Sequence, residues 1–175
     1  MTRRHGTPMC IALMWMTLCP GIVQAGGDTP LIDAVRADDR RAVVALLAEG
    51  ADVNARRADG ATALAWAAVR SNVGIAELLL EAGADPDLTN ELGIGPLSLA
   101  IQNGRVDMVR LLLEQGADPD APRENGETPL MTAVRMGQLD VMKLLLDRGA
   151  DVNASEKRFG QTALMWATGN PAAVR

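Results

Sequence analysis

The chain has 175 residues, which is room for one ordinary domain, and it carries a formal net charge of −5 at pH 7. An acidic protein repels phosphate groups, so we expect no nucleic-acid partner. The two cysteines, Cys10 and Cys19, and the one histidine, His5, lie near the start of the chain. The remainder lacks the side chains of Ser–His–Asp and Cys–His catalytic sites and of the usual zinc sites. We therefore expect no enzyme activity, no metal and no cofactor.

The start of the chain has the order of a secretory signal. Arg3 and Arg4 form a positive start, residues 9–18 form an apolar run, and residues 23–25 end in the small residue Ala25. The apolar run is shorter than the roughly 20 residues that a membrane-spanning helix needs. We predict a signal peptide over residues 1–25, cleavage after Ala25, and no membrane insertion of the mature protein.

Cleavage would remove Arg3 and Arg4 but no acidic residue, leaving 15 basic and 22 acidic residues. It would also remove both cysteines, which suits an oxidising compartment. The excess of arginine over lysine points to a GC-rich bacterial genome, so we predict a periplasmic or secreted protein of the bacterial type. A lipid anchor on Cys19 is the weaker alternative, because bulky Leu18 occupies the place of a small residue.

A regular repeat dominates the rest of the sequence. The string Gly-Ala-Asp starts at Gly50, Gly83, Gly116 and Gly149, which are equally spaced along the chain. A fixed interval of this kind indicates one small supersecondary unit copied along the chain. The predicted units cover residues 28–58, 59–91, 92–124 and 125–158, with an incomplete fifth unit over 159–175.

Each full unit contains two short helical patterns. In the fourth unit Thr128 can cap the first helix, Pro129 suits its first position, and the helix is expected to end near Gly137. The second helix has apolar residues at helical spacing and is expected to end at Gly149. The stretches between units, such as residues 117–127, are polar and rich in turn-forming residues.

Neither helix of a unit can bury its apolar face alone, so neighbouring units must stack. We expect the leucines at 111–113 to pack between those at 78–80 and those at 144–146.

These motifs closely resemble the ankyrin repeat. The interval from one Gly-Ala-Asp string to the next equals the period of that repeat, about 33 residues. The Thr-Pro-Leu-x-x-Ala start, the central glycine, the Val-x-x-Leu-Leu segment and the Gly-Ala-Asp-x-Asn end also match over residues 28–175. The resemblance implies an all-α solenoid of helix-turn-helix units joined by β-hairpin-like loops. It also implies binding of a partner protein through the loop tips and the inner helices of a concave face.

Two departures from the repeat pattern have structural consequences. Gly95 stands in the third unit where threonine is usual, so that helix should lack a side-chain cap. The fifth unit carries one residue more between Gly149 and Thr162 than the other units do, and we expect the loop over residues 156–159 to swell.

Acidic or amide residues recur in pairs after each Gly-Ala string and form a ladder. A calcium site is one interpretation, but no twelve-residue calcium loop with its glycine and closing glutamate follows. We favour local hydrogen bonds that stabilise the turns. The pairs are Asp52/Asn54, Asp85/Asp87, Asp118/Asp120 and Asp151/Asn153.

Candidate partner-binding residues fall in two groups. At the loop tips Leu92, Ile94 and Phe159 are apolar where polar residues are expected, which indicates either a contact point or side chains folded back on the next tip. The second group recurs at the unit spacing on the inner helices and forms either a binding strip or a solvated polar face. Its members are Arg36, Val69, Arg70, Gln102, Asn103, Arg135 and Met136.

Trp66 and Trp166 occupy equivalent places on the first helices of their units. Because the third unit has Leu99 in that place, we expect both rings to pack as core rather than to serve as binding anchors.

Together these observations predict a monomeric, non-enzymatic module that binds an as yet unidentified protein. Arg175 falls where the second helix of the fifth unit should begin, so we expect a fragment of a longer protein, with fraying after Trp166 as the alternative. One other function is the regulatory or targeting array of a longer enzyme truncated at Arg175. Another is a secreted effector.

Overall fold

The computed structural model describes residues 29–169, so the predicted signal peptide and residues 170–175 lie outside the described residues. Short helices follow one another in pairs through this range, and the fifth unit contributes one described helix. In chain order they are α1 (Pro30–Arg36), α2 (Arg40–Ala48), α3 (Ala63–Arg70), α4 (Val73–Glu81), α5 (Pro96–Gln102), α6 (Val106–Glu114), α7 (Pro129–Arg135), α8 (Leu139–Asp147) and α9 (Ala163–Ala167).

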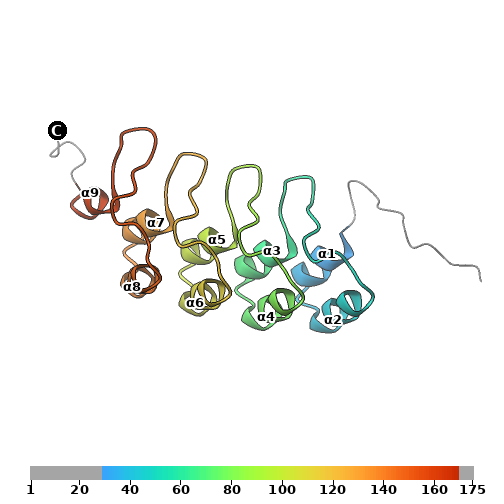
Figure 1. Cartoon of the computed structure of the whole chain (residues 1–175). Coiled ribbons are helices and arrows are strands. Elements are labelled where there is room, and N and C mark those ends of the chain that lie inside the picture. The colour runs from blue at the N-terminus through green and yellow to red at the C-terminus, as the bar shows by residue number, and fades with distance from the viewer. Residues whose placement is uncertain (1–28, 170–175) are drawn as a thin grey trace, which may run out of the picture.

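The helices form two layers. The inner helices α1, α3, α5, α7 and α9 lie side by side, and the outer helices α2, α4, α6 and α8 form a second row (Figure 1). The loops between units all project in the same direction, away from the outer helices (Figure 1). This arrangement confirms the all-α stack of paired helices expected from the sequence.

The inter-unit loops close with hairpin-like backbone hydrogen bonds. In the loops that lead into units two, three and four, the backbone amide of Arg57, Asn90 or Arg123 donates to the carbonyl oxygen four residues on, at 3.0 to 3.1 Å. In the loop that leads into the fifth unit, the backbone amide of Glu156 instead donates to the carbonyl oxygen of Gln161, five residues on. The extra residue is therefore accommodated in the loop over residues 156–159, as expected.

Side-chain caps begin some of the inner helices. The Thr128 hydroxyl accepts a hydrogen bond from the Met131 amide at 3.4 Å, and Thr62 caps α3 in the same way. Gly95 at the start of α5 offers no side-chain acceptor, as the sequence predicted. The first helix of unit four ends before Gly137, whose φ of +67° lies in the left-handed region that glycine adopts without strain.

Three of the outer helices, α4, α6 and α8, each bury a leucine completely at the centre of the stack. Leu79, Leu112 and Leu145 are fully buried, and α6 contacts both α4 and α8. The flanking leucines, such as Leu111, pack against the same core. Stacking thus supplies the apolar partner that a single helix pair lacks.

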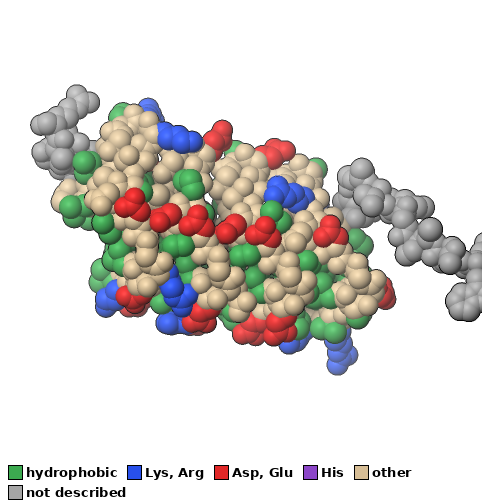
Figure 2. Space-filling view, viewed as in Figure 1, with side chains coloured by type: hydrophobic (Ala, Val, Ile, Leu, Met, Phe, Trp, Pro, Cys, Tyr) green, Lys and Arg blue, Asp and Glu red, His purple; other side chains and the backbone are tan. Residues whose placement is uncertain are grey.

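The acidic ladder connects successive units. The amide of Asp85 donates to Asn54 Oδ1 at 2.9 Å, and that of Asp118 donates to Asp87 Oδ1 at 2.9 Å. Asp151 repeats the contact with the next unit through Asp120 Oδ1 at 2.8 Å. A row of acidic side chains crosses the face seen in Figure 2. These bonds support the structural interpretation of the ladder.

Residues 29–169 hold neither a metal-binding cluster nor a membrane-spanning helix. In this part of the chain no group of three or more His, Cys, Asp and Glu side chains is placed to hold a metal ion. No helix of the same range combines the length and the apolar character needed to cross a bilayer.

Candidate partner-binding surface

The apolar residues at the loop tips face solvent. The Leu92 and Phe159 side chains are 61% and 65% exposed, so neither is folded back against a neighbouring tip. The Arg158 guanidinium lies over the Phe159 ring, 4.8 Å from its centroid. Ile94 is half-buried.

A hollow opens between the tips of units three and four. Its volume is about 400 Å³, and it is lined by Leu92, Ile94, Arg123, Glu124 and Asn125. Apolar and charged side chains therefore meet at one place on the loop edge.

The inner-helix candidates gather where these helices end. Arg36, Arg70, Gln102 and Arg135 are the last residues of α1, α3, α5 and α7, and all four are exposed. A basic side chain at a helix C-terminus also interacts favourably with the helix dipole. Their remaining neighbours Val69, Asn103 and Met136 are exposed as well.

Several of these candidates already have partners within the protein. Arg36 lies 3.6 Å from an Asp33 carboxylate oxygen and 4.8 Å from the centroid of the Trp66 ring. The side-chain amide of Asn103 donates a hydrogen bond to the backbone carbonyl oxygen of Val69 at 3.3 Å and so joins the third unit to α3. Asn103 therefore has a structural role besides its place on the candidate surface.

Trp66 and Trp166 are both half-buried and pack against the core, as the comparison with Leu99 indicated. The Trp166 indole N–H also donates to Gln161 Oε1 at 2.7 Å.

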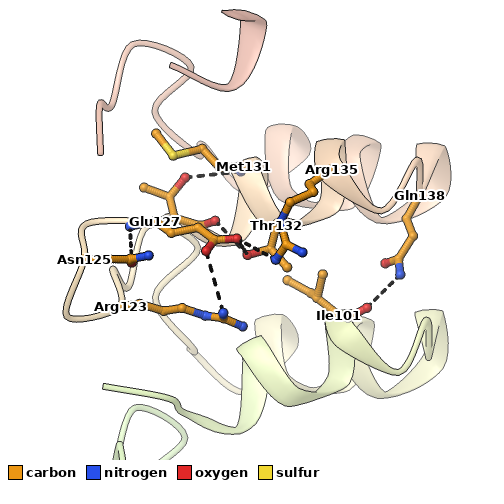
Figure 3. A network of polar contacts seen from close by, with 9 residues as sticks. Ile101, Arg123, Asn125, Glu127, Met131, Thr132, Arg135 and Gln138 are labelled. Carbon is orange, nitrogen blue, oxygen red and sulfur yellow. Dashed lines mark hydrogen bonds and ion pairs between the residues drawn. The ribbon is translucent and has the colours of Figure 1, made fainter. Parts of the chain in front are cut away.

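A buried carboxylate, Glu127, lies between the loop tip of unit four and helix α7 (Figure 3). Its Oε1 accepts hydrogen bonds from the Thr132 hydroxyl at 2.9 Å and from Arg135 Nη2 at 2.8 Å. Its Oε2 lies 3.7 Å from Arg123 Nη1. The Glu127 amide donates to Asn125 Oδ1 at 2.9 Å, which fixes the loop behind it.

These contacts keep Glu127 ionised. Burial raises the pKa of its carboxyl, but the hydrogen bonds from Arg135 and Thr132 and the positive charge of Arg123 lower it, and the result lies below the ordinary value. The charge is thus held in place at neutral pH and orients an arginine on each side.

Sequence reasoning missed Glu127. A weak signal was present, because the equivalent residues of units two, three and five, Ala61, Ile94 and Gln161, are uncharged, whereas Asp28 of unit one is acidic. An acidic residue directly before a Thr-Pro pair occurs at both Asp28 and Glu127, so the charge alone did not single out unit four.

Glu127 connects two hollows. Arg123 borders the hollow at the tips, and Arg135 borders a second hollow of about 350 Å³ together with Met165 and Trp166. Each hollow places an arginine beside apolar side chains. Such an arrangement can accept a protein segment that carries both apolar side chains and carboxylates.

A second ordered carboxylate stabilises the swollen fifth loop. Burial raises the pKa of the Glu156 carboxyl, whereas hydrogen bonds from the backbone N–H groups of Gln161, Arg158 and Phe159 lower it, and the net pKa lies below the ordinary value. This ordering supports the backbone on which Phe159 is presented.

Comparison with known proteins agrees with this architecture. A family model described as ankyrin repeats, in three copies, matches residues 4–90 and again residues 82–156. The human protein named mitochondrial disaggregase is 40% identical over 77 residues, which make up 43% of this chain and 11% of that protein. The chain therefore spans a small part of the length of this relative. Ankyrin repeats generally serve as protein–protein interaction modules, and with most of its length matched, this chain belongs to the ankyrin repeat family.

Proposed function

We propose that this protein is a non-enzymatic module that binds another protein across the loop tips and inner-helix ends of units three to five. The observation that carries this proposal is the pair of hollows connected by Glu127, each with an arginine beside exposed or half-exposed apolar side chains.

The charges near the tips indicate the character of the partner. Arg123, Lys157 and Arg158 lie on the loops that lead into units four and five, beside one exposed acidic residue, Glu124, although the chain as a whole is acidic. The Glu156 carboxylate on the same loops is turned inward and accepts backbone hydrogen bonds. A partner segment with acidic and apolar residues matches this surface.

Site-specific photo-crosslinking in the native cells tests the proposal. A photoreactive side chain at Leu92 should give a discrete adduct with one protein, and the same side chain at the exposed Arg110 of α6 should not. The double change Leu92→Ser with Phe159→Ser should reduce the yield from a reactive group at Gln102. Equal adducts from Leu92 and Arg110 would contradict the proposal.

We also propose that the protein is exported. The support is the order of features in residues 1–25, which is a positively charged start, an apolar run and a small residue at the expected cleavage site. N-terminal sequencing of protein from the periplasm or the medium should begin at Gly26. Protein found only in the cytoplasm with Met1 retained would contradict export. The distribution between periplasm and medium distinguishes a periplasmic module from a secreted effector.

A second candidate function is the regulatory or targeting array of a longer enzyme. The partial similarity to a disaggregase favours it, because the aligned stretch is a small part of that relative. Sequencing the gene beyond codon 175 decides between the two functions. A catalytic domain in the same reading frame would support the second candidate, and a stop codon would exclude it.

A further inference from the structure

The guanidinium of Arg123 has two nitrogen atoms without a hydrogen-bond partner. Its Nη1 lies 3.7 Å from Glu127 Oε2 (Figure 3). Its Nε and Nη2 are buried and have no acceptor among residues 29–169. These two nitrogens lie on one edge of the guanidinium, and that edge matches the two oxygens of a carboxylate. Because buried donors in folded proteins are nearly always paired, this edge calls for an acceptor that the described residues do not supply.

The repeat shows which partner the equivalent arginine has two units earlier. Arg57 stands in the place of Arg123, and the backbone amides of both residues close their loops with the same hydrogen bond. Arg57 Nη1 donates to Asp33 Oδ1 of α1 at 3.1 Å. The same shift of two repeat periods places Leu99 of α5 at the position of Asp33. Arg123 therefore lacks, on the preceding inner helix, the carboxylate that Arg57 has.

The place of this absent carboxylate borders the candidate surface. Leu99 is half-buried, and Gln102 at the end of the same helix is exposed. The Arg123 side chain keeps 16% of its surface exposed. Helix α5 is packed between α3 and α7, so this place lies within the array rather than at either end of it.

The rest of the chain offers no suitable carboxylate side chain. In residues 1–28 and 170–175 the one acidic residue is Asp28. It directly precedes Thr29 at the start of α1, and α3 lies between α1 and α5 (Figure 1). Glu127 already accepts hydrogen bonds through its Oε1 from Thr132 and Arg135. A second carboxylate for Arg123 is therefore expected from another molecule.

Arg123 can turn toward such a carboxylate without dismantling the contacts of Glu127. The 3.7 Å between Arg123 Nη1 and Glu127 Oε2 is longer than a hydrogen bond, whereas Arg135 Nη2 donates to Glu127 Oε1 at 2.8 Å. Glu127 thus keeps its closest partners when Arg123 moves. Since two arginines share one carboxylate here, the network can accept a further negative charge.

We propose that Arg123 selects the partner protein by pairing with an aspartate or glutamate side chain that the partner places over Leu99. This inference deepens the proposed function and rests on it. The incoming carboxylate takes the place that Asp33 has beside Arg57, and an apolar neighbour of the acidic residue packs on Leu99. Binding moves the Arg123 guanidinium away from Glu127 and toward the partner.

Nuclear magnetic resonance of the arginine side chains tests the pairing with a defined probe. The probe is the peptide acetyl-Leu-Glu-Leu-amide, and its control has glutamine in place of glutamate. In the full chain with isotope-labelled arginine, the Nε–H signal of Arg123 should shift saturably with the glutamate peptide and not with the control. Loss of this signal in Arg123→Lys assigns it.

A pair of variants at Leu99 makes this test specific. Leu99→Asp supplies the carboxylate within the chain, and Leu99→Asn removes the same apolar contacts without adding a charge. The glutamate peptide should bind Leu99→Asp about five-fold or more weakly than it binds Leu99→Asn. Equal affinities of the two variants would overturn the inference, as would equal shifts with the two peptides or no shift of the Arg123 signal.

Photo-crosslinking in the native cells separates this inference from the proposed function. A photoreactive side chain at Gln102 should give the partner adduct. Arg123→Gln should reduce its yield about five-fold or more, whereas Arg110→Gln, at an exposed arginine of α6, should not. A discrete adduct that does not depend on Arg123 would overturn this inference and leave the proposed function standing. The absence of any discrete adduct from Leu92 and Gln102 would overturn both.

Discussion

At the scale of single residues, Glu127 organises the candidate surface. Its carboxylate contacts Arg123 on the loop and Thr132 and Arg135 on α7, so one side chain fixes the position of two structural elements. Removing the buried carboxylate leaves the neighbouring arginines and the threonine hydroxyl without their partner. The resulting loss in the free energy of unfolding is larger than the net stabilisation that the intact network provides.

Replacing Glu127 by glutamine should lower the free energy of unfolding at pH 7 by about 1–3 kcal/mol. The pH dependence has a definite sign. Because the folded-state pKa of Glu127 lies below its ordinary value of 4.5, its contribution is present above pH 4.5 and is lost as the pH falls through the folded-state value. Urea unfolding between pH 7 and 3 should show a smaller acid-induced loss in Glu127→Gln than in the parent.

The matched control is Glu124→Gln, an exposed residue on the same loop, which should leave both the stability and its pH dependence nearly unchanged. If the two variants behave alike, the buried network does not stabilise the fold.

Replacing Gly95 by threonine is expected to stabilise the fold, in contrast to the change at Glu127. Its backbone has φ −99° and ψ 175°, close to the values of the capping residue Thr62, and an added Cβ would meet Thr89 Cγ2 at 3.4 Å. Gly95→Thr should therefore raise the free energy of unfolding by about 0.5–1 kcal/mol through reduced freedom of the unfolded chain and a new cap. A lower thermal midpoint in calorimetry would mean that Thr89 cannot make room.

At the scale of elements, stability comes from contacts between one helix pair and the next. Leu112 of α6 is fully buried, and the helix is packed on both sides, by α4 and by α8. Neither surface exists in an isolated unit, so the helices depend on their neighbours.

Leu112→Ala should lower the free energy of unfolding by about 2–5 kcal/mol, because it opens a cavity in the centre of the stack. Leu139→Ala on the exposed side of α8 is the matched control and should change it by less than about 0.5 kcal/mol. Urea unfolding followed by circular dichroism measures both. Similar losses would mean that the central leucines are not the main source of stacking energy.

The sequence predicted the helices well, because the fixed period lets the units be aligned with one another, and each helix pattern is then seen several times. Proline, threonine and glycine at fixed places indicated the start of α7 and its end near Gly137. The contacts of Glu127 were beyond such reasoning, because they depend on how the loop places Arg123 over α7. The sequence placed Leu92 and Phe159 at the tips but left open whether they are exposed or folded back on the next tip. It did not predict the two hollows, since hollows depend on the packing of adjacent loops.

At the scale of the whole molecule, the helices of residues 29–169 differ in how far neighbouring units enclose them. Helix α9 contacts α7 but has Leu164 exposed, whereas α5 and α6 are enclosed by units on both sides. Local opening requires the least free energy where the fewest apolar contacts are lost.

We therefore expect amide hydrogen exchange to be fastest in α9 and slowest in α5 and α6, with mass spectrometry of peptic peptides as the measurement. Uniform exchange rates along residues 29–169 would show that the array opens as a single unit.

The hydrogen-bonded ladder also has a consequence for how the gene can change. Each link joins a backbone N–H to a side-chain oxygen of Asn54, Asp87 or Asp120, and it repeats at the same interval as the unit itself. A duplication or deletion of one whole period within the gene would therefore join two ends that fit each other, and the seam would be restored without any compensating mutation. Recombination can thus lengthen or shorten this protein in whole steps, whereas an insertion or deletion of another length between the two residues of a link would change their spacing, unlike the extra residue that the fifth loop accommodates.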